Sequence, residues 1–471
     1  MSFLLRRKPL DAPVPDRHHR LARTLGWPHL IALGVGAVVG TGIYTLIGVG
    51  AGLAGPAVIL SFALAGLVCA CAALAYAELA SMMPLSGSAY TYAYSALGEL
   101  IAWIVGWALI LEYTVVVSAV AVGWSGYAAG FLQGLGIHVP QMIPLGTLGA
   151  MVVHVNPLAV LIIAVVAGLL ILGTRESANI NSALVLVKIA ALAAFVLIAL
   201  PHFDASHFRP FMPNGFVAHQ AGGQTVGVMA AAAIIFFAFY GFDAVSTAAE
   251  EAKTPGRDLA IGIVGSMVIC TLLYMVVAAA AIGGLPVVEF AASGEPLAHI
   301  VRTLGNATAA TLIAGAAVVA MPTVLLAFLY GQSRIFFVMA RDGLLPRGLG
   351  AVHPRLGTPA RVTVFTAIIC SALAGIFSLA DIAALANAGT LAAFTAVGIS
   401  LVVMRVRNPQ HPRPFRAPMP WVISTVTVAG CVYLFLSLPE RTKVLFFTWM
   451  VIGLPVYLLW GARRSLLARA E

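Results

Sequence analysis

The stretch GVGAVVGTGIYTLIG (residues 34–48) lies within the first long apolar segment of the chain. A helix that only has to cross a lipid bilayer can use leucine throughout, yet this one carries five glycines, two threonines and a tyrosine. Each glycine inside a helix costs about 1 kcal/mol relative to alanine. The stretch therefore either packs closely against a neighbouring helix or interrupts the helix for a functional reason.

The overall composition places the chain in a membrane. Of its 471 residues, 61% are hydrophobic and only 9% are charged, and the mean hydropathy is +1.00, whereas an average soluble domain has about 25% charged residues. A spanning helix needs about 20 mostly apolar residues. We therefore expect an all-α, polytopic membrane protein with twelve transmembrane helices, at residues 28–53, 56–82, 98–131, 156–173, 180–200, 226–249, 259–284, 308–338, 361–379, 382–404, 419–437 and 444–462.

The distribution of basic residues predicts the orientation of these spans. With the N-terminus in the cytoplasm, 21 of the 26 Lys and Arg residues fall on the inner side, four fall on the outer side, and Lys188 lies within a span. This bias is the positive-inside pattern of membrane proteins. We expect both termini to be cytoplasmic, and we attribute the net charge of +9 to topology and the lipid bilayer, with no nucleic-acid partner.

A second apolar segment is also interrupted by residues that weaken a helix. It reads AAAIIFFAFYGFDAVSTAAEE (residues 231–251), with YGFD at its centre. Two interrupted segments in corresponding positions point to a transporter built from two repeats. Because the segments are five spans apart, the second repeat is inverted. We expect a cytoplasmic tail at 1–27, repeats at 28–200 and 226–404, and two extra helices with a C-terminal tail at 405–471.

Three long motifs resemble one known family. YAELASMMPLSGSAYTYAYSALGELIAWIVGWALILEY (residues 76–113) resembles the second and third helices of the cationic amino acid transporter (CAT) family, in the amino acid–polyamine–organocation (APC) superfamily. FYGFDAVSTAAEEAKTPGRDLAIGI (239–263) is similar to its sixth-helix signature, and RIFFVMARDGLLP (334–346) resembles the exit of its eighth helix. The resemblance implies a LeuT-like 5+5 inverted repeat with discontinuous helices 1 and 6, in the inner (plasma) membrane of a bacterium.

The first interruption is a candidate site for a carboxylate. Unwinding at residues 40–42 frees backbone N–H groups near the membrane midplane, and glycine allows a ligand to approach closely. The resemblance implies that this segment binds the carboxylate of an amino acid, through Val38, Gly40, Thr41 and Gly42. Close packing through the Gly36–Gly40 G-x-x-x-G spacing is the alternative, and both explanations can hold together.

The second interruption supplies the complementary group. Unwinding at Gly241 frees carbonyl oxygens, which suit an ammonium group, and the resemblance implies that those of Phe237, Ala238 and Tyr240 bind the substrate amine. Phe237 also occupies the position of an aromatic gate in the family, although ordinary packing explains most of the neighbouring aromatics. Met321 aligns with a residue that limits the size of the substrate pocket, and a core methionine is the alternative.

Lys188 is the only basic residue deep inside a span, about 10 Å from its inner end at 1.5 Å per residue. The side chain either snorkels back to the inner surface or stays buried, where desolvation disfavours its charged form and allows it to exchange a proton. In sodium-coupled members of the fold a sodium ion lies between helices 1, 5 and 8, and in several CAT-like members a lysine takes that place. We therefore expect Lys188 to couple transport to protons, with no sodium and no other cofactor.

Two acids also lie inside spans, where a charge at the helix centre costs at least about 2.5–3.5 kcal/mol on insertion scales. Asp243 follows the second interruption, where it either ties the loosened backbone together or acts as a proton-sensitive gate. Glu112 is expected to pair with Lys188 or to accept a hydrogen bond at an interrupted helix. Both acids join Lys188 as candidates for proton coupling, whereas Glu78, at the end of the second span, is expected to anchor an interface or a loop.

These features together favour a secondary active transporter that takes up small neutral or cationic L-amino acids by alternating access, as a monomer or with a small membrane subunit. An exchanger of amino acids or polyamines on the same fold is the alternative. A membrane-embedded enzyme is disfavoured because most of the 11 histidines lie in tails and loops, and a channel is disfavoured because no continuous ring of polar residues is present. The sequence also lacks a P-loop, which argues against an ATP-driven pump, and a recognisable metal-binding motif.

Overall fold

The computed structural model describes residues 6–9, 25–83, 87–140, 142–148, 151–172, 178–247, 252–350 and 359–470. The first eight helices are α1 (Trp27–Val38), α2 (Thr41–Tyr44), α3 (Leu46–Ala54), α4 (Val58–Met82), α5 (Ser88–Ala96), α6 (Glu99–Gly134), α7 (Pro157–Leu172) and α8 (Ala178–Ala199). Two short antiparallel hairpins are also present. One is formed by β1 (Ile143–Leu148) and β2 (Met151–Val155), and the other by β3 (His219–Ala221) and β4 (Gln224–Val226).

The remaining helices complete the described chain. They are α9 (Val228–Ile235), α10 (Ala244–Thr247), α11 (Pro255–Gly284), α12 (Val287–Phe290), α13 (Pro296–Thr303), α14 (Ala307–Ala320), α15 (Pro322–Arg341), α16 (Ala360–Ile376), α17 (Leu379–Arg407), α18 (Pro420–Leu436), α19 (Glu440–Val456), α20 (Ala462–Arg464) and α21 (Leu466–Ala470). Short 3₁₀ turns include Phe236–Phe239, and a π-helical turn at Tyr457–Gly461 follows α19.

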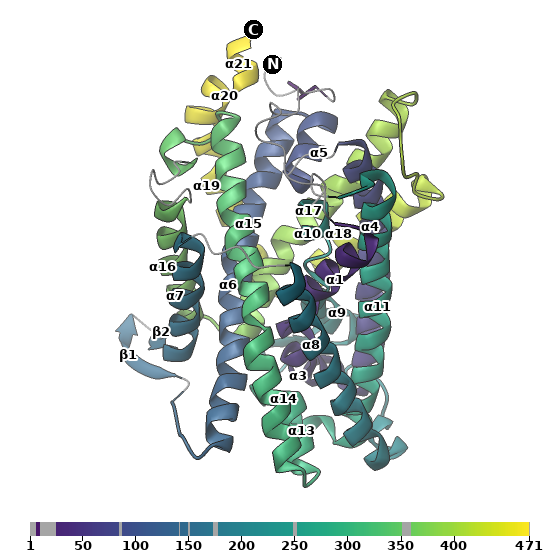
Figure 1. The fold of residues 1–471 in the computed structure, drawn as a ribbon, viewed down its shortest axis with the longest axis vertical. Coiled ribbons are helices and arrows are strands. Elements are labelled where there is room, and N and C mark those ends of the chain that lie inside the picture. Colours follow the sequence, from purple (N-terminus) through teal and green to yellow (C-terminus); the bar gives the residue numbers. More distant parts are fainter. Residues whose placement is uncertain are drawn as a thin grey trace.

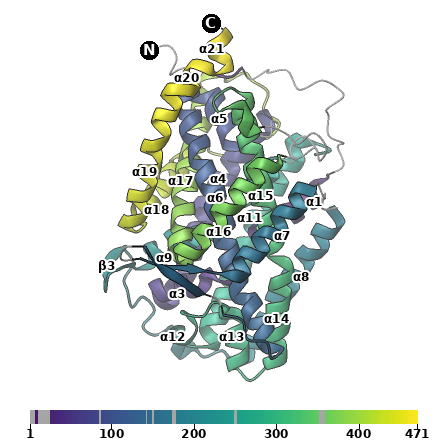
Figure 2. The ribbon, with the colours of Figure 1, turned by 90° about the vertical axis from the view of Figure 1, so that its left-hand side faces the viewer.

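The long helices run side by side along the longest axis of the molecule (Figure 1). The short helices α5, α20 and α21 lie at one end of this bundle, and α12 and α13 lie at the opposite end, as the view turned by 90° also shows (Figure 2). The hairpin of β1 and β2 lies beside α7 and α16, and β2 contacts α16. Neither hairpin was expected from the sequence, because both lie in loops between apolar segments.

Length and composition make the described chain a multi-pass membrane protein. Seven helices are long and apolar enough to cross a membrane: Leu46–Met82, Glu99–Gly134, Ala183–His202, Gly256–Gly284, Ala307–Arg341, Leu379–Arg407 and Glu440–Arg464. Five further apolar helices have 10–17 residues: Trp27–Val38, Pro157–Leu172, Val228–Phe239, Ala360–Ile376 and Pro420–Leu436. All twelve apolar stretches of the sequence fall on these helices. Large apolar side chains such as Leu186, Leu272 and Leu312 are exposed on them, as lipid-facing residues would be.

The helices that carry the interruptions are buried inside this bundle. α1 packs against α8, α11 and α15, and α9 packs against α3, α4 and α17. A Cβ atom on Gly34 would lie 2.5 Å from the Ser266 hydroxyl oxygen of α11, so a larger residue would force the two helices apart. Close packing is therefore a sufficient reason for glycine at the beginning of the opening stretch.

A buried ion-pair cluster closes the loop between α17 and α18. The carboxylate of Glu78, at the end of α4, accepts hydrogen bonds from Arg405 (2.6 and 2.7 Å), from Nε of Arg413 (3.2 Å) and from the Ala417 amide (2.8 Å). Glu78 is completely buried and Arg413 is 9% exposed. The expectation that Glu78 anchors an interface is therefore confirmed.

Candidate functional site

The first interruption lies within residues 34–48. Helix α1 ends at Val38 and α2 begins at Thr41, so that Val39 and Gly40 connect two separate helices inside the protein. The first amides of a helix have no acceptor within that helix, which leaves the N–H groups of Thr41 and Gly42 free for another partner. The carbonyl of Val38 accepts a hydrogen bond from the Tyr274 hydroxyl at 2.9 Å. The chain therefore presents amide donors at the point where the sequence predicted them.

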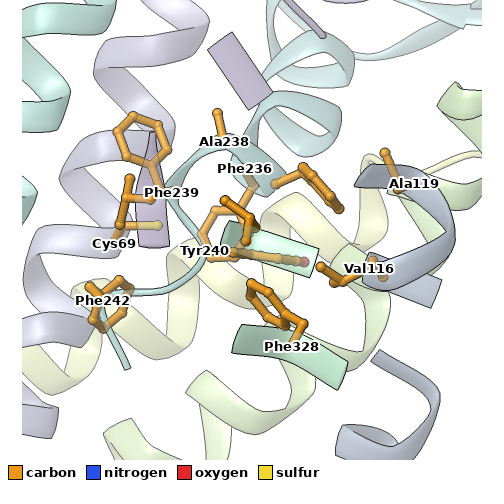
Figure 3. Packing of buried hydrophobic residues seen from close by; sticks show 14 of the residues in the cluster. Cys69, Val116, Ala119, Phe236, Ala238, Phe239, Tyr240, Phe242 and Phe328 are labelled. Atoms are coloured by element: carbon orange, nitrogen blue, oxygen red, sulfur yellow. The ribbon is translucent and has the colours of Figure 1, made fainter. Parts of the chain in front are cut away.

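The second interruption begins where α9 ends at Ile235. The chain continues as a 3₁₀ turn over Phe236–Phe239 and becomes helical again only at Ala244. Gly241 has a φ of +107°, a conformation that residues with a Cβ atom rarely adopt. The aromatic side chains of Phe236, Phe239, Tyr240 and Phe242 project from this part of the chain (Figure 3).

The two interruptions touch each other through their backbones. A Cβ atom on Gly42 would lie 2.2 Å from the Cα atom of Ala238, and one on Gly241 would lie 2.7 Å from the carbonyl carbon of Ala37. Every predicted substrate-binding residue is buried in the structure: Val38, Gly40, Thr41, Gly42, Phe237, Ala238, Tyr240, Gly241 and Met321. The structure thus brings the predicted carboxylate and amine sites together in a region that is closed to solvent.

Two predicted pocket residues lie beside the interruptions. The Phe237 ring lies 5.1 Å from the Tyr240 ring and is 5% exposed. Met321 is completely buried between α14 and α15, and its sulfur lies 4.0 Å from the Thr41 hydroxyl oxygen. Both contacts fit a pocket around the two interruptions, whereas the gate role of Phe237 and the size-limiting role of Met321 stay predictions.

Lys188 connects three helices near the first interruption. Its ammonium group donates to the Gly36 carbonyl of α1 at 2.7 Å and to the Thr323 hydroxyl of α15 at 2.9 Å. The residue is 1% exposed, so its side chain does not snorkel to the surface. Its own carbonyl accepts a hydrogen bond from the Tyr44 hydroxyl at 3.0 Å, and the amine therefore lies where α1, α8 and α15 meet.

Two further buried groups are the carboxyls of Glu112, on α6, and Asp243, directly before α10. Glu112 is 3% exposed and Asp243 is 7% exposed. Glu112 Oε2 is buried and makes no hydrogen bond to any residue that the structure describes. The ion pairs among the described residues do not include one between Glu112 and Lys188, so the structure does not bring these two predicted partners together.

Sequence reasoning missed two polar residues around the site, namely Thr323 and Asn387. Each is buried within an apolar helix and forms a hydrogen bond to another element. Polar side chains within membrane helices are costly unless they have partners. Their positions inside apolar segments were therefore the available signal, although that signal does not identify the partner.

The loop between α12 and α13 packs onto the glycines of α6. Cβ atoms on Gly126 and Gly130 would lie 2.5 Å from the Gly294 carbonyl oxygen and 1.8 Å from Glu295 Oε2. Glu295 is 8% exposed and pairs with Arg302 at 2.6 Å. Burial raises the pKa of the Glu295 carboxyl, and the facing Arg302 and His299 side chains only partly oppose this effect.

We expect this loop to make the stability of the protein depend on pH. A raised pKa in the folded protein means that the contribution of Glu295 is complete below the ordinary carboxyl pKa and is lost as the pH rises through the folded pKa. The thermal unfolding midpoint of the wild type in detergent should therefore decrease between about pH 4 and 8. This decrease should be smaller in Glu295→Gln. Glu440→Gln, which removes a 76% exposed acid paired with Lys443, is the control. Equal pH slopes for wild type and Glu295→Gln would contradict the prediction.

Comparison with known proteins identifies the family. A family model described as "Amino acid permease" matches residues 25–457. The chain is 43% identical over 448 residues to the branched-chain amino acid permease BcaP of Bacillus subtilis (strain 168), covering 94% of both chains. It is 40% identical over 470 residues to the methylthioribose transporter of the same organism, covering 99% of this chain and 100% of the relative. It is 36% identical over 414 residues to cationic amino acid transporter 4, vacuolar, of Arabidopsis thaliana, covering 87% of this chain and 68% of the relative.

These matches confirm the resemblance that the three motifs indicated. They span nearly the whole chain, including both interrupted segments and every predicted site residue. The chain therefore belongs to the amino acid permease family of the APC superfamily, and it is a membrane transporter and not an enzyme.

Proposed function

We propose that this protein takes up small neutral or cationic L-amino acids together with protons, by alternating access, across the plasma membrane of a bacterium. The observation that carries the proposal is the direct contact between the two interrupted helices, at Gly42 with Ala238 and at Gly241 with Ala37. An amino acid carries a carboxylate and an amine a few ångströms apart, and at this contact Gly42, in the first turn of α2, adjoins Ala238 of the 3₁₀ turn. A single amino acid can therefore bind both segments at once.

Each end of the substrate has a chemically suitable partner. The N-terminal amides of α2 suit the carboxylate because helix N-termini carry free N–H groups and a partial positive charge. The carbonyls of Phe237, Ala238 and Tyr240 suit the ammonium group, because they belong to a 3₁₀ turn and the unwound segment after it. Phe237 closes the site on one side, and Met321 limits the space for the substrate side chain.

Lys188 is the proposed coupling residue. In the protonated state its ammonium group holds α1 to α15 through Gly36 and Thr323. Loss of the proton reduces its donors and its charge, and weakens the connection at a point four residues before the first interruption. The position of α1, and with it the geometry of the amides, would thereby respond to protonation.

The architecture that we propose has twelve membrane-spanning segments in a LeuT-like 5+5 inverted repeat, with two extra helices at the end of the chain and both termini in the cytoplasm. The seven long and five shorter apolar helices support the number of spans. The interruptions after Val38 and Ile235 lie at equivalent positions in the two proposed repeats, 28–200 and 226–404. The basic residues concentrated on one side support the orientation.

Uptake into proteoliposomes of known pH and membrane potential tests the proposal. The substrate panel should contain a branched-chain amino acid, arginine and methylthioribose, because the relatives are named for substrates of these kinds, and alanine as a small neutral amino acid. Uptake of an amino acid that increases with an inward proton gradient is the expected result. Uptake that requires an amino acid on the other side, with no dependence on the gradient, would instead identify an exchanger.

Lys188→Ala is expected to abolish gradient-driven accumulation, because the variant has no group that carries the proton between α1 and α15. We expect at least a 50-fold reduction in the accumulated substrate, at unchanged protein content in the vesicles. Lys443→Ala, which removes a lysine from the pair with Glu440 on α19, is the matched control and should accumulate substrate like the wild type. Undiminished proton-driven uptake by Lys188→Ala would exclude Lys188 from the mechanism.

A further inference from the structure

Asn387 lies in the middle of α17 and is completely buried. Its amide nitrogen donates to the carbonyls of Ala233 and Ile234 at 2.5 and 2.9 Å, and its carbonyl oxygen accepts a hydrogen bond from the Tyr240 hydroxyl at 2.5 Å. One side chain therefore contacts the unwound segment at both ends, namely at the last turn of α9 and at the residue before Gly241.

The Ala233 carbonyl needs an external donor because α9 ends at this point, and the Ile234 carbonyl accepts from Asn387 in addition to the Phe236 amide. The last four carbonyls of a helix lack their usual intrahelical partners, and here the chain tightens into the 3₁₀ turn Phe236–Phe239 directly after Ile235. A buried carbonyl without a donor is energetically unfavourable. The amide of Asn387 removes this cost only for the conformation in which α9 ends here, and it thereby favours the interrupted geometry over a continuous helix.

The same region of α17 also contacts the helix that carries Glu112. A Cβ atom on Gly389 would lie 3.0 Å from the Ala108 carbonyl oxygen and 3.1 Å from the Cβ atom of Glu112. α17 therefore holds the unwound segment at a fixed position relative to α6.

We propose that Asn387 is a positioning residue, which fixes the carbonyls of Phe237, Ala238 and Tyr240 in the geometry that binds the substrate amine. The proposal rests on the proposed function for the identity of the ligand, but the hydrogen bonds of Asn387 are independent of it. Asn387 itself does not need to touch the substrate, because it acts through the end of α9 and through the Tyr240 hydroxyl.

Hydrogen–deuterium exchange of the purified, full-length protein in nanodiscs tests the proposal without any substrate. Asn387→Leu keeps the branched shape of the side chain and removes all three hydrogen bonds, and we expect at least tenfold faster exchange in peptides that cover residues 228–243. Ser400→Ala is the matched control on the same helix, because among the residues that the structure describes the Ser400 hydroxyl bonds only to the Ala396 carbonyl of α17 itself. It should leave the exchange of the segment unchanged, and unchanged exchange in Asn387→Leu would overturn the proposal.

Transport measurements test whether the geometry that Asn387 fixes in residues 228–243 matters for substrate binding. In the proteoliposome assay we expect Asn387→Leu to raise the KM at least tenfold with a smaller change in the maximal rate, and Tyr240→Phe to raise the KM about threefold. Since both changes act on one segment, Tyr240→Phe should raise the KM by less than a further twofold in the Asn387→Leu background. If the two substitutions raise the KM independently, so that their effects multiply in the double variant, the shared role is overturned. A wild-type KM in Asn387→Leu would show that Asn387 is a structural residue and does not position the substrate site.

Two further variants keep the test decisive if Asn387→Leu does not fold. Asn387→Asp retains an acceptor for Tyr240 and replaces the donor that faces the two carbonyls, whereas Tyr240→Phe deletes a single hydroxyl group and keeps the ring. Each should accelerate exchange of residues 228–243 at least threefold, and the absence of acceleration in both would overturn the proposal. If wild-type protein transports no amino acid, the proposed function fails, while the exchange experiment still decides the role of Asn387.

Discussion

Gly42→Ala is expected to reduce amino acid uptake at least 100-fold while the protein still inserts into the membrane. The added Cβ atom would lie 2.2 Å from the Cα atom and 2.5 Å from the Cβ atom of Ala238. Both distances are far below van der Waals contact, and the nearest neighbour is backbone that cannot rotate away. The two interrupted helices must therefore separate, which moves the amides of α2 away from the carbonyls that we propose bind the other end of the substrate.

The effect can be assigned to this contact with two further variants. Gly168→Ala on α7 is the matched control, because a Cβ atom there meets nothing within 4 Å and alanine favours helix by about 1 kcal/mol. It should transport like the wild type. Ala238→Gly should not rescue Gly42→Ala, since the closest atom is the Cα and not the side chain. Retention of more than about a tenth of wild-type uptake by Gly42→Ala would contradict the arrangement of the two helices.

Periodic and compositional features of the sequence predicted most of the fold. Apolar runs of about 20 residues mark membrane helices because the bilayer sets their length, and all twelve runs fall on helices. The interruptions were also predictable, because glycines at 40 and 42 and the YGFD segment weaken a helix locally. The β1–β2 hairpin and the α12–α13 loop were not, since they depend on contacts with α16 and α6 that no local pattern encodes.

The candidate site shows the same division between local and tertiary information. The cost of a charge in a membrane places Lys188, Glu112 and Asp243 in the protein interior, and all three are buried. That cost does not select a partner. Lys188 bonds to the Gly36 carbonyl and a threonine instead of pairing with Glu112, because its partners are set by how α1, α8 and α15 pack together.

Asn387 illustrates what single-residue reasoning leaves out. An asparagine within ALANAGTLAAF is visible as an intramembrane polar residue, and such residues bridge helices. Its importance depends on where α9 ends, which is a property of another segment 150 residues away in the chain. The hydrogen bonds at the interruption were therefore predictable in kind but not in detail.

Glu78→Gln is expected to destabilise the folded protein by about 3–5 kcal/mol, the usual cost of removing one partner from a buried ion pair. The variant keeps the volume of the side chain but leaves Arg413, whose side chain is 2% exposed, without a compensating charge. The backbone carbonyls of Met404, Asn408, Pro409 and His411 that also accept from Arg413 cannot neutralise it. The buried arginine therefore raises the free energy of the folded state directly.

The thermal unfolding midpoint of detergent-solubilised protein measures this effect. Glu440→Gln is the matched comparison, because it breaks an ion pair of the same 2.6 Å length in which the acid is 76% exposed, and exposed pairs contribute about 0–1 kcal/mol. The midpoint of Glu78→Gln should fall far below that of Glu440→Gln, and Arg413→Met in the Glu78→Gln background should restore part of the loss by removing the unpaired charge. Equal midpoints for the two single variants would show that α4 and the α17–α18 loop stay together without the buried charges. Restoration by the second substitution, in contrast, would attribute the loss to the uncompensated arginine and not to the missing carboxylate contacts.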